Sequence, residues 1–380
     1  MSDTSRTHGF ATRAIHSGEQ TDPATGAHNT PIYQTATYAF HSLEDKDAIL
    51  SGEREGYFYS RYGNPTSHAF EDKLAALEGA EAGLVSASGM GVISAALLGF
   101  VCAGDHIVAS DAVYSVADEF FQVDLPRFGI EITRADFSDL DAVRNAIQPK
   151  TRILYTEFLS NPRLKVVDVP AVAEIARKHS LVSIVDNTFG TPYLFRPVEH
   201  GIDLVLHSAT KYISGHGDVV AGAICGCRQY IGCVRRMVAH LGSPNSPFNS
   251  WLLLRGVKTL ELRMERHCQN AVAVAHYLEN HPDVLAVFYP GLESHPGHDI
   301  ADRLTNGRFG GMLSFEIEGG SESGQRFANA LELCDHAVSL GDVSTLVWPN
   351  SHDNLVRVSV GVETVDDIIA DFDQAFHKIG

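Results

Sequence analysis

Between residues 82 and 226, short apolar runs alternate with longer stretches in which apolar positions recur with helical spacing. The apolar runs are bounded by turn-forming residues, as strands usually are. They are LVSAS (84–88), HIVAS (106–110), EITRA (131–135), RILYTEF (152–158), LVSIVDN (181–187), LVLHSAT (204–210) and GAICG (222–226). Strands that alternate with helices indicate βαβ units, and nearly continuous apolar strands are typical of a sheet covered on both faces. The pattern therefore predicts an α/β fold with a mostly parallel sheet.

Two of the intervening helices have recognisable boundaries. In SDLDAV, Ser138 is a suitable N-cap and is followed by acidic residues in the first turn. In VVDVPAVAEIARKHS, Pro170 falls in the first turn, and Lys178 and His179 fall in the last turn, where they complement the helix dipole.

The pattern changes towards both ends of the chain. Residues 249–281 predict one long amphipathic helical region, with a possible break at Gly256, and shorter strands and helices follow. Residues 1–60 contain few periodic segments and predict an extended arm that contacts a neighbouring subunit. We therefore expect an arm over 1–60, a large domain over 61–248 and a smaller α+β domain over 249–380.

The composition disfavours several classes of binding partner. The 380-residue chain is 44% hydrophobic and 20% charged, and its 29 basic and 47 acidic residues give a net charge of 29 − 47 = −18. This balance disfavours nucleic acid and anionic membranes as partners. No segment has the length of a membrane span, and the first ten residues lack the apolar core of a secretory signal.

The cysteines and histidines do not indicate a metal site. Six scattered cysteines are typical of reduced thiols, so we expect a cytoplasmic protein. The CGC at 225–227 has the wrong spacing for a zinc half-site, and HPGH at 295–298 is a loop motif. We expect no metal.

Polar residues gather where the apolar runs end. Ligands of open α/β sheets bind at the carboxyl ends of the strands. The residues at these ends are Ser88, Gly89 and Met90 after the first run, Tyr114 after the second, Asn161 after RILYTEF, Asp186 at the end of LVSIVD, and Ser208, Thr210 and Lys211 after LVLH. We expect them to meet at one edge of the sheet.

Each of these residues also has a simpler interpretation. The small residues of SGMG (88–91) suit close packing as well as an anion at a helix N-terminus. Asp186 suits a turn or a helix N-cap, Tyr114 suits packing, and Lys211 suits extension to solvent. Together, however, they match what pyridoxal phosphate requires: an amine for a Schiff base, an acid for the ring nitrogen, a phosphate cradle and an aromatic ring. A nicotinamide site would need a GxGxxG fingerprint, which is missing after the first strand.

With these residues in place, the chain resembles the Cys/Met metabolism family of pyridoxal-phosphate-dependent enzymes, whose activities include methionine γ-lyase, cystathionine γ-lyase, cystathionine γ-synthase and O-acetylhomoserine sulfhydrylase. The resemblance covers nearly the whole chain. It rests on 12–40, YSRYGNPT (59–66), SGMG, DNTF (186–189), SATKYISGHGD (208–218), 247–267 and VRVSVGVE (356–363). It implies the aspartate-aminotransferase architecture (fold type I), with a seven-stranded sheet, and a homotetramer built as a dimer of dimers.

The resemblance also implies residue roles. Lys211 would hold the cofactor, Asp186 would pair with its ring nitrogen and Tyr114 would stack on the ring. Arg357 would bind the substrate carboxylate, a task suited to a guanidinium. The remaining implied contacts are Ser88, Gly89, Met90, Ser208 and Thr210 at the phosphate, Asn161 near the cofactor and substrate, Val338 and Ser339 at the substrate, and Tyr59 and Arg61 reaching the phosphate of the neighbouring subunit.

The implied reaction takes place at Cγ of a sulfur-containing or activated L-amino acid, through a vinylglycine-type quinonoid intermediate. Lys211 would move the protons, and Tyr114 would be the acid near the leaving group. Elimination and γ-replacement both fit, the latter with S-adenosylmethionine or an O-acylhomoserine and an unusual nucleophile. An aminotransferase is the alternative from another class, because it shares the fold and the Lys/Asp pair.

The chain departs from the family pattern near the substrate. Val338 stands where cystathionine-handling members often have glutamate, and Val116 stands where methionine γ-lyases commonly have cysteine. Ser344 replaces a usual glutamate, and WPNSHDN (348–354) replaces a longer loop. We expect the short loop to open the γ side of the pocket. Trp348 and His352 then either line it or are an ordinary packed tryptophan and a solvent-exposed histidine.

Overall fold

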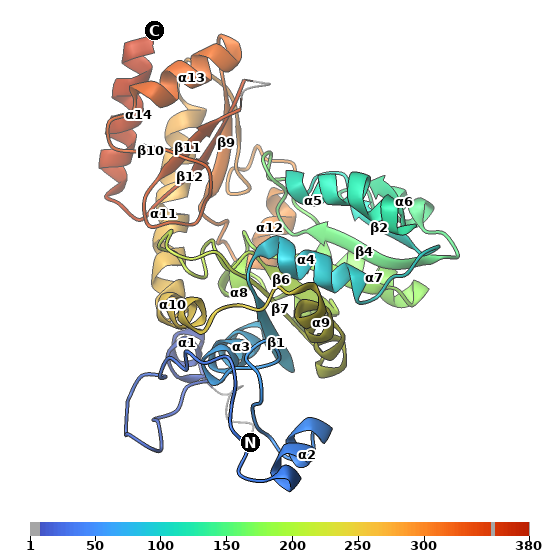
Figure 1. Ribbon diagram of the computed structural model, residues 1–380. Helices are drawn as coiled ribbons and strands as arrows, with labels where there is room; N and C mark the ends of the chain where they lie inside the picture. Colours follow the sequence, from blue (N-terminus) through green and yellow to red (C-terminus); the bar gives the residue numbers. More distant parts are fainter. Residues whose placement is uncertain (1–7, 351–353, 380) are drawn as a thin grey trace.

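Two β-sheets organise the protein, as seen in a computed structural model that describes residues 8–350 and 354–379 (Figure 1). The seven-stranded sheet has the order β1-β7-β6-β5-β4-β2-β3, and the five-stranded sheet has the order β10-β11-β12-β9-β8. The first comes from the middle of the chain and the second from its C-terminal part. The α/β fold with a smaller C-terminal α+β unit is therefore confirmed. The boundaries expected at 60 and 248 stay a prediction.

The strands of the larger sheet coincide with the apolar runs of the sequence. They are β1 (Ala82–Ser86), β2 (His106–Ser110), β3 (Glu131–Ala135), β4 (Thr151–Glu157), β5 (Val182–Asp186), β6 (Leu204–His207) and β7 (Gly222–Gly226). All neighbours are parallel except β7, which runs antiparallel to both β1 and β6. The carboxyl ends of the parallel strands consequently share one edge of the sheet.

Helices cover both faces of this sheet because successive strand residues point to opposite sides. Ile184 and Leu206 pack with α4 (Gly89–Leu98), α5 (Ser115–Glu119) and α9 (Arg228–Leu241). Val185 and Val205 pack with the helices of the other face. These are α3 (Pro65–Glu78), α6 (Leu140–Ala146) and α7 (Val169–His179); the connections also contain η1 (Phe120–Asp124), η2 (Leu125–Phe128), α8 (Thr191–Leu194) and η3 (Pro197–His200).

One of the two predicted helix starts is correct. Helix α7 has Pro170 in its first turn and ends in Arg177, Lys178 and His179. The prediction of Ser138 as an N-cap is wrong, because the carboxylate of the next residue, Asp139, accepts the N–H groups of the first turn of α6. Ser138 instead donates to Asp136 from its main chain and its hydroxyl.

The C-terminal unit buries an aromatic core between its sheet and three helices. Phe315 of the sheet packs against Phe327 and Phe376 of the helices, and Phe327 packs against Phe372. The elements of this part are α10 (Pro247–Val257), α11 (Leu260–Glu279), β8 (Val284–Phe288), α12 (His298–Thr305), β9 (Met312–Ile317), α13 (Gly320–Ala330), β10 (Asp335–His336), β11 (Leu346–Pro349), β12 (Leu355–Ser359) and α14 (Val365–Ile379).

The helical region expected over 249–281 is divided into α10 and α11 just after Gly256. A side chain at Gly256 would collide with the main-chain oxygen of Ser214, so only glycine permits this approach. The buried guanidinium of Arg263 then donates to the carbonyls of Gly256 (2.9 Å) and Tyr212 (2.6 Å). At the break, Arg263 therefore links α11 to the end of α10 and to the loop that follows β6.

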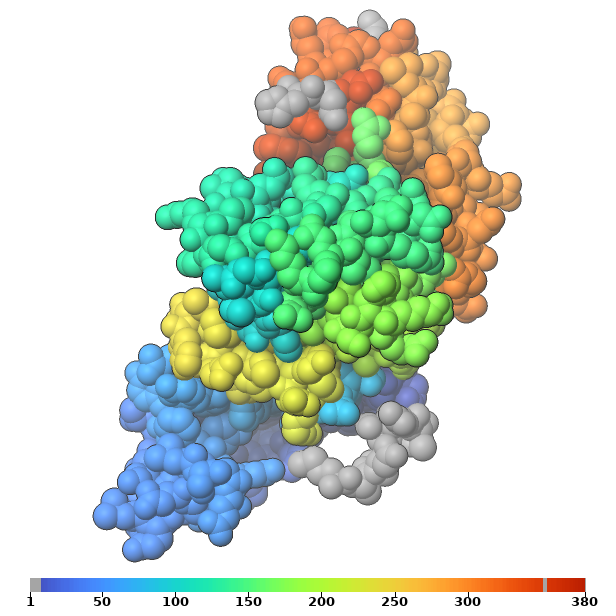
Figure 2. Space-filling model, turned by 90° about the vertical axis from the view of Figure 1, so that its right-hand side faces the viewer, coloured from blue at the N-terminus to red at the C-terminus, as the bar shows by residue number. Residues whose placement is uncertain are grey.

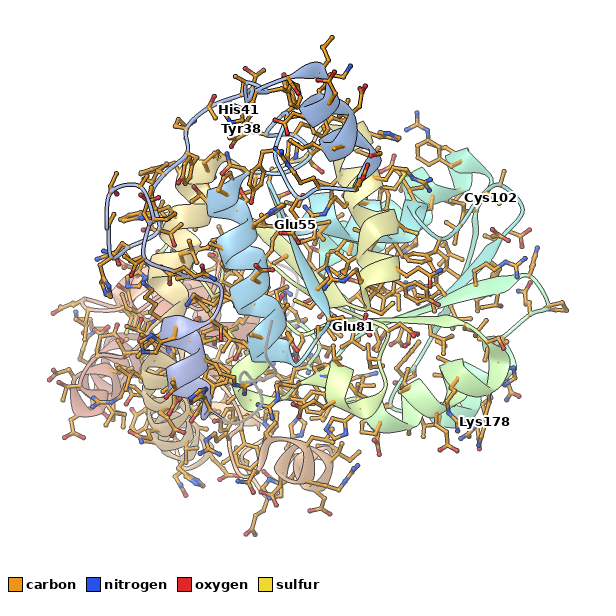
Figure 3. All side chains as sticks on the ribbon, turned by 90° about the horizontal axis from the view of Figure 1, so that it is seen from below. Tyr38, His41, Glu55, Glu81, Cys102 and Lys178 are labelled. Carbon is orange, nitrogen blue, oxygen red and sulfur yellow. The ribbon has the colours of Figure 1, made fainter. Side chains whose placement is uncertain are left out.

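The N-terminal segment contains two helices that the sequence pattern did not predict, α1 (Phe10–His16) and α2 (Leu43–Ser51). The part of the segment that contains α2 projects from the rest of the molecule (Figure 2). Tyr38 and His41, on the loop before α2, lie far from Lys178 of α7 (Figure 3). This projection agrees with an arm, whereas α1 is packed on the same chain.

A buried lysine anchors α1. Lys73 of α3 donates to the carbonyls of Ala14 (2.8 Å) and Ile15 (3.0 Å) in the last turn of α1, where carbonyls lack helical partners. The Lys73 side chain is fully buried and pairs with Glu19 at 3.0 Å. Glu19 also pairs with Lys258, which is 29% exposed. Burial lowers the pKa of Lys73, and Glu19 opposes that shift.

No helix among the described residues is both long and apolar enough to span a bilayer.

The two lysines that share Glu19 provide a matched test of this anchor. Lys73→Met leaves two α1 carbonyls without a donor and Glu19 with one cation fewer, so we expect a loss of about 3 kcal/mol in the free energy of unfolding. Lys258→Met removes a partly exposed pair and should cost less than about 1 kcal/mol. Urea unfolding at fixed protein concentration measures both, and equal losses would contradict the anchoring role of Lys73.

Candidate functional site

A cavity of about 640 Å³ opens at the carboxyl edge of the seven-stranded sheet and is closed on the other side by the C-terminal unit. Most residues expected at the site line it. They are Ser88, Gly89, Met90, Tyr114, Asn161, Asp186, Ser208, Thr210, Lys211, Val338, Ser339 and Arg357. Parallel strand ends thus bring together residues from distant parts of the sequence, as expected for an open α/β sheet.

Lys211 lies four residues after β6, and its amine donates to the hydroxyl of Ser339 at 2.7 Å. Burial, with a further contribution from the positive charge of Arg357, lowers the pKa of Lys211 to about 8. A larger fraction of this amine is therefore neutral, and so nucleophilic, near neutral pH than for an exposed lysine.

Arg357 of β12 reaches the same point from the other sheet. Its guanidinium donates to the carbonyl of Ser339 (3.0 Å) and lies 3.5 Å from the side-chain oxygen of Asn161. Burial lowers its pKa, yet arginine stays charged at physiological pH. Ser339 thus contacts both cations, and its φ of 99° is a conformation that serine rarely adopts.

The start of helix α4 forms an edge of the cavity that suits an anion. Ser88 is the N-cap, and Gly89 and Met90 begin the helix, so main-chain N–H groups and the positive end of the dipole are available. A Cβ on Gly89 would lie 3.3 Å from Ser208, which shows how closely the two segments approach. The hydroxyl of Thr210 is held by the main chain of Ala221.

Two carboxyl groups form the floor of the cavity. Asp186, at the end of β5, accepts the N–H of Thr188 at 2.9 Å, and burial raises its pKa. Glu157 occupies the paired position on β4 and accepts the N–H of Tyr114 at 2.6 Å. Glu157 was not among the site residues predicted from the sequence, although it gives the same signal as Asp186: an acid at the end of a buried strand.

The mouth of the cavity is apolar. Val338 (63% exposed), Val220 (60%) and Trp348 (40%) line it, and Trp348 lies opposite Arg357 in the β11–β12 register. Among the described lining residues, the only acids are Glu157 and Asp186 on the floor. Trp348 is therefore a lining residue, while His352 and the centre of the 349–354 loop lie outside the described residues.

Tyr59 and Arg61 do not line this cavity. They lie on the N-terminal segment, where the Arg61 guanidinium is 5.3 Å from the centroids of both the Tyr59 and Tyr62 rings. Tyr59 is 39% exposed. Within one chain, the structure therefore does not bring these two residues to the other candidate site residues.

Comparison with known proteins identifies the family. Residues 11–377 match the family described as "Cys/Met metabolism PLP-dependent enzyme". The chain is 46% identical to an L-methionine gamma-lyase of Porphyromonas gingivalis over 96% of each protein. It is 38% identical to an O-succinylhomoserine sulfhydrylase of Pseudomonas aeruginosa over 95% of this chain and 94% of that protein.

A solved structure supports the same assignment. A putative O-acetylhomoserine (thiol)-lyase from Campylobacter jejuni, which carries a pyridoxyl-lysine, superposes with a TM-score of 0.93 at 33% identity, covering 97% of this chain and 99% of that one. The extended, nearly full-length match places the resemblance in the whole fold and not in a local motif. The chain therefore belongs to the Cys/Met metabolism family of pyridoxal-phosphate-dependent enzymes.

Proposed function

We propose that this enzyme catalyses α,γ-elimination on a methionine-like amino acid, as a methionine γ-lyase does. With methionine, one water is consumed, and methanethiol, ammonia and 2-oxobutanoate are released. The observation that carries the proposal is the apolar γ side of the cavity, where Val338 and Trp348 suit an uncharged thioether. No acid among the described lining residues lies there to pair with a distal ammonium group of the substrate. Relatives at 43–46% identity that are named L-methionine gamma-lyase support it.

The residues present fit pyridoxal phosphate. Lys211 supplies a buried amine, the N-terminus of α4 with Ser208 and Thr210 supplies a phosphate seat, and Asp186 supplies a carboxylate for the ring nitrogen. Tyr114 supplies an aromatic ring. When bound, the cofactor would provide an electron sink for the negative charge that develops beside it.

The chain's own residues then have distinct tasks. Arg357 binds the α-carboxylate of the substrate, and Asn161 and Ser339 hold the guanidinium in place. The neutral amine of Lys211 takes the proton from Cα and moves protons between carbon atoms. The Tyr114 hydroxyl, on a side chain that is 43% exposed, donates a proton to the departing sulfur.

The apolar, aromatic γ side also suits γ-replacement, which is a second candidate function. Trp348 and Tyr114 present aromatic rings to the γ side, and such rings attract a sulfonium such as that of S-adenosylmethionine. An O-acylhomoserine with a nucleophile is the related possibility, supported by the sulfhydrylase among the relatives. An aminotransferase would instead yield a keto acid without free ammonia.

We also propose a homotetramer in which active sites are shared between subunits. Several apolar side chains of the N-terminal segment are exposed in the single chain, namely Ile32, Tyr33, Leu43, Leu50, Tyr59 and Tyr62. Covering them with a second copy would bury this surface and would allow Tyr59 and Arg61 to reach a neighbour's phosphate seat.

Six unpaired cysteines support a cytoplasmic location.

The pH dependence of Lys211 tests its role. Burial and Arg357 lower its pKa, so the neutral amine should increase as the pH rises through about 8. In cofactor-free protein, reductive trapping with a small aldehyde should label Lys211 with this midpoint, measured by peptide mass spectrometry. Arg357→Met removes a positive neighbour and should move the midpoint upward. A midpoint near 10.4, the ordinary value for lysine, would contradict the assignment.

A substrate panel tests the function itself. The wild-type enzyme should release 2-oxobutanoate and ammonia from methionine, and Val338→Glu should move its preference in kcat/KM by about tenfold or more towards cystathionine, whose distal ammonium the new carboxylate would pair with. Trp348→Leu keeps an apolar wall and should lower the turnover of sulfonium substrates more than that of methionine. Release of methylthioadenosine from S-adenosylmethionine, without 2-oxobutanoate from methionine, would favour γ-replacement and overturn elimination.

Mixing two inactive variants tests the shared site. Arg61→Ala and Lys211→Ala should each abolish most activity, because the first removes a phosphate contact and the second the amine. If the two residues serve the same site from different subunits, mixed oligomers regain one intact site per hybrid pair, or about a quarter of wild-type activity. No recovery after subunit exchange, verified by mass spectrometry of the hybrids, would place Arg61 outside the neighbouring site.

A further inference from the structure

Glu157 is a buried acid that the mechanism above does not use. It is the last residue of β4, is 6% exposed, and lines the cavity beside Asp186. The two acids are register partners on adjacent parallel strands, so their side chains leave the same face of the sheet. Neighbouring strands lie about 4.8 Å apart, which places the two carboxyl groups within strong electrostatic contact.

The carboxyl group of Glu157 contacts the main chain of two site residues, Tyr114 and Asn161. Its Oε1 accepts the main-chain N–H of Tyr114 at 2.6 Å, a short bond between residues 43 positions apart. The main-chain N–H of Asn161 also interacts with this carboxyl. Tyr114 precedes helix α5 and Asn161 lies in the loop after β4, so one side chain holds both loops that border the cavity.

The charge of Glu157 is constrained by its surroundings. Asp186 faces it from β5, and Tyr155 precedes it by two residues on the same face of β4. Lys211 and Arg357 lie across the cavity, and His207 of β6 favours the ionised form of Asp186. Among the described residues, no cation forms an ion pair with either carboxyl group. Two adjacent carboxylates, of which Glu157 is buried and Asp186 partly buried, do not both stay ionised near neutral pH without an ion pair.

The two acids differ in what a cofactor demands of them. Asp186 must be ionised to hold a protonated ring nitrogen, whereas Glu157 contacts only N–H groups of the main chain. Burial, followed by the charge of Asp186, raises the pKa of Glu157 well above its usual range. The two main-chain N–H groups favour the carboxylate form of Glu157, but its burial and the neighbouring Asp186 carboxylate outweigh them and favour the proton on Glu157.

We propose that Glu157 is a positioning residue that holds the Tyr114 and Asn161 loops as a neutral carboxylic acid and leaves the single negative charge of the floor on Asp186. A carboxylic acid keeps a carbonyl oxygen for the Tyr114 N–H and adds no repulsion beneath the ring. This inference rests on the proposed cofactor site but concerns a residue outside the reacting groups.

Three variants distinguish the effect of losing the hydrogen-bond acceptor at position 157, the effect of its charge, and the effect of removing a buried polar group nearby. Glu157→Gln keeps a neutral acceptor of the same length, Glu157→Met keeps the length and removes the acceptor, and Tyr155→Phe removes a neighbouring buried hydroxyl that has no described partner. Each is prepared as the full-length protein, freed of cofactor and titrated with pyridoxal phosphate. The readouts are the dissociation constant from visible absorbance, the circular dichroism of the bound cofactor and thermal unfolding.

We expect Glu157→Gln and Tyr155→Phe to bind within about threefold of the wild type and to keep the circular dichroism band, because the Tyr114 N–H keeps an acceptor. Glu157→Met should bind at least about tenfold more weakly and lose most of the band, because a buried N–H is left unpaired. If Glu157→Met does not fold, Glu157→Asn, which is one carbon too short to reach Tyr114, takes its place.

Infrared difference spectra of cofactor-free protein test the charge directly. The wild type should show a carboxylic-acid carbonyl band that Glu157→Gln lacks. Absence of that band, or weakened binding by Glu157→Gln equal to that of Glu157→Met, would show that Glu157 is ionised and overturn the proposal. Wild-type affinity in Glu157→Met would overturn the positioning role. Failure of the wild type to bind pyridoxal phosphate would instead refute the proposed cofactor site.

Discussion

Two cations, Lys211 and Arg357, meet at one serine, and the geometry of the site depends on that contact. They come from the loop after β6 and from β12, they repel each other, and Ser339 accepts hydrogen bonds from both. Ser339 adopts a rarely populated backbone conformation to do so, which the surrounding packing must stabilise. A substrate carboxylate bound to Arg357 would offset part of this positive charge, so binding is favoured by an interaction already built into the free protein.

The supports of this contact extend well beyond the cavity. Arg263 binds the carbonyl of Tyr212, the residue after Lys211, and the carbonyl of Gly256 at the end of α10. Gly341 allows the segment after Ser339 to touch the main chain of Tyr212, since a side chain there would collide with it. On the floor, Glu157 links the ends of the strands to Tyr114. Each support joins segments that are distant in sequence, which is how two sheets present one set of groups.

The sequence predicted the fold and the cofactor well because both depend on local patterns. Buried parallel strands produce continuous apolar runs, and motifs such as SGMG and SATK lie directly at strand ends. Features set by tertiary contacts were missed. Helix α1 was missed because it depends on Lys73 of another helix; a break at Gly256 was predicted, but not the close approach to Ser214 that requires it. The role of Ser339 as a shared acceptor required knowing that residues 211, 339 and 357 meet.

The pairing of Trp348 with Arg357 across strands β11 and β12 has a consequence for how such enzymes diversify. The wall proposed for the γ side and the arginine proposed to bind the carboxylate are neighbours on one hairpin, so we expect a replacement at 348 to affect 357 as well. Substitutions at 348 should therefore change both the selectivity for the γ-substituent and the affinity for the substrate carboxylate. New specificities should arise more readily at Val338, which lies outside that hairpin. Directed libraries aimed at new leaving groups should therefore vary 338 first and change 348 only together with residues that restore the arginine.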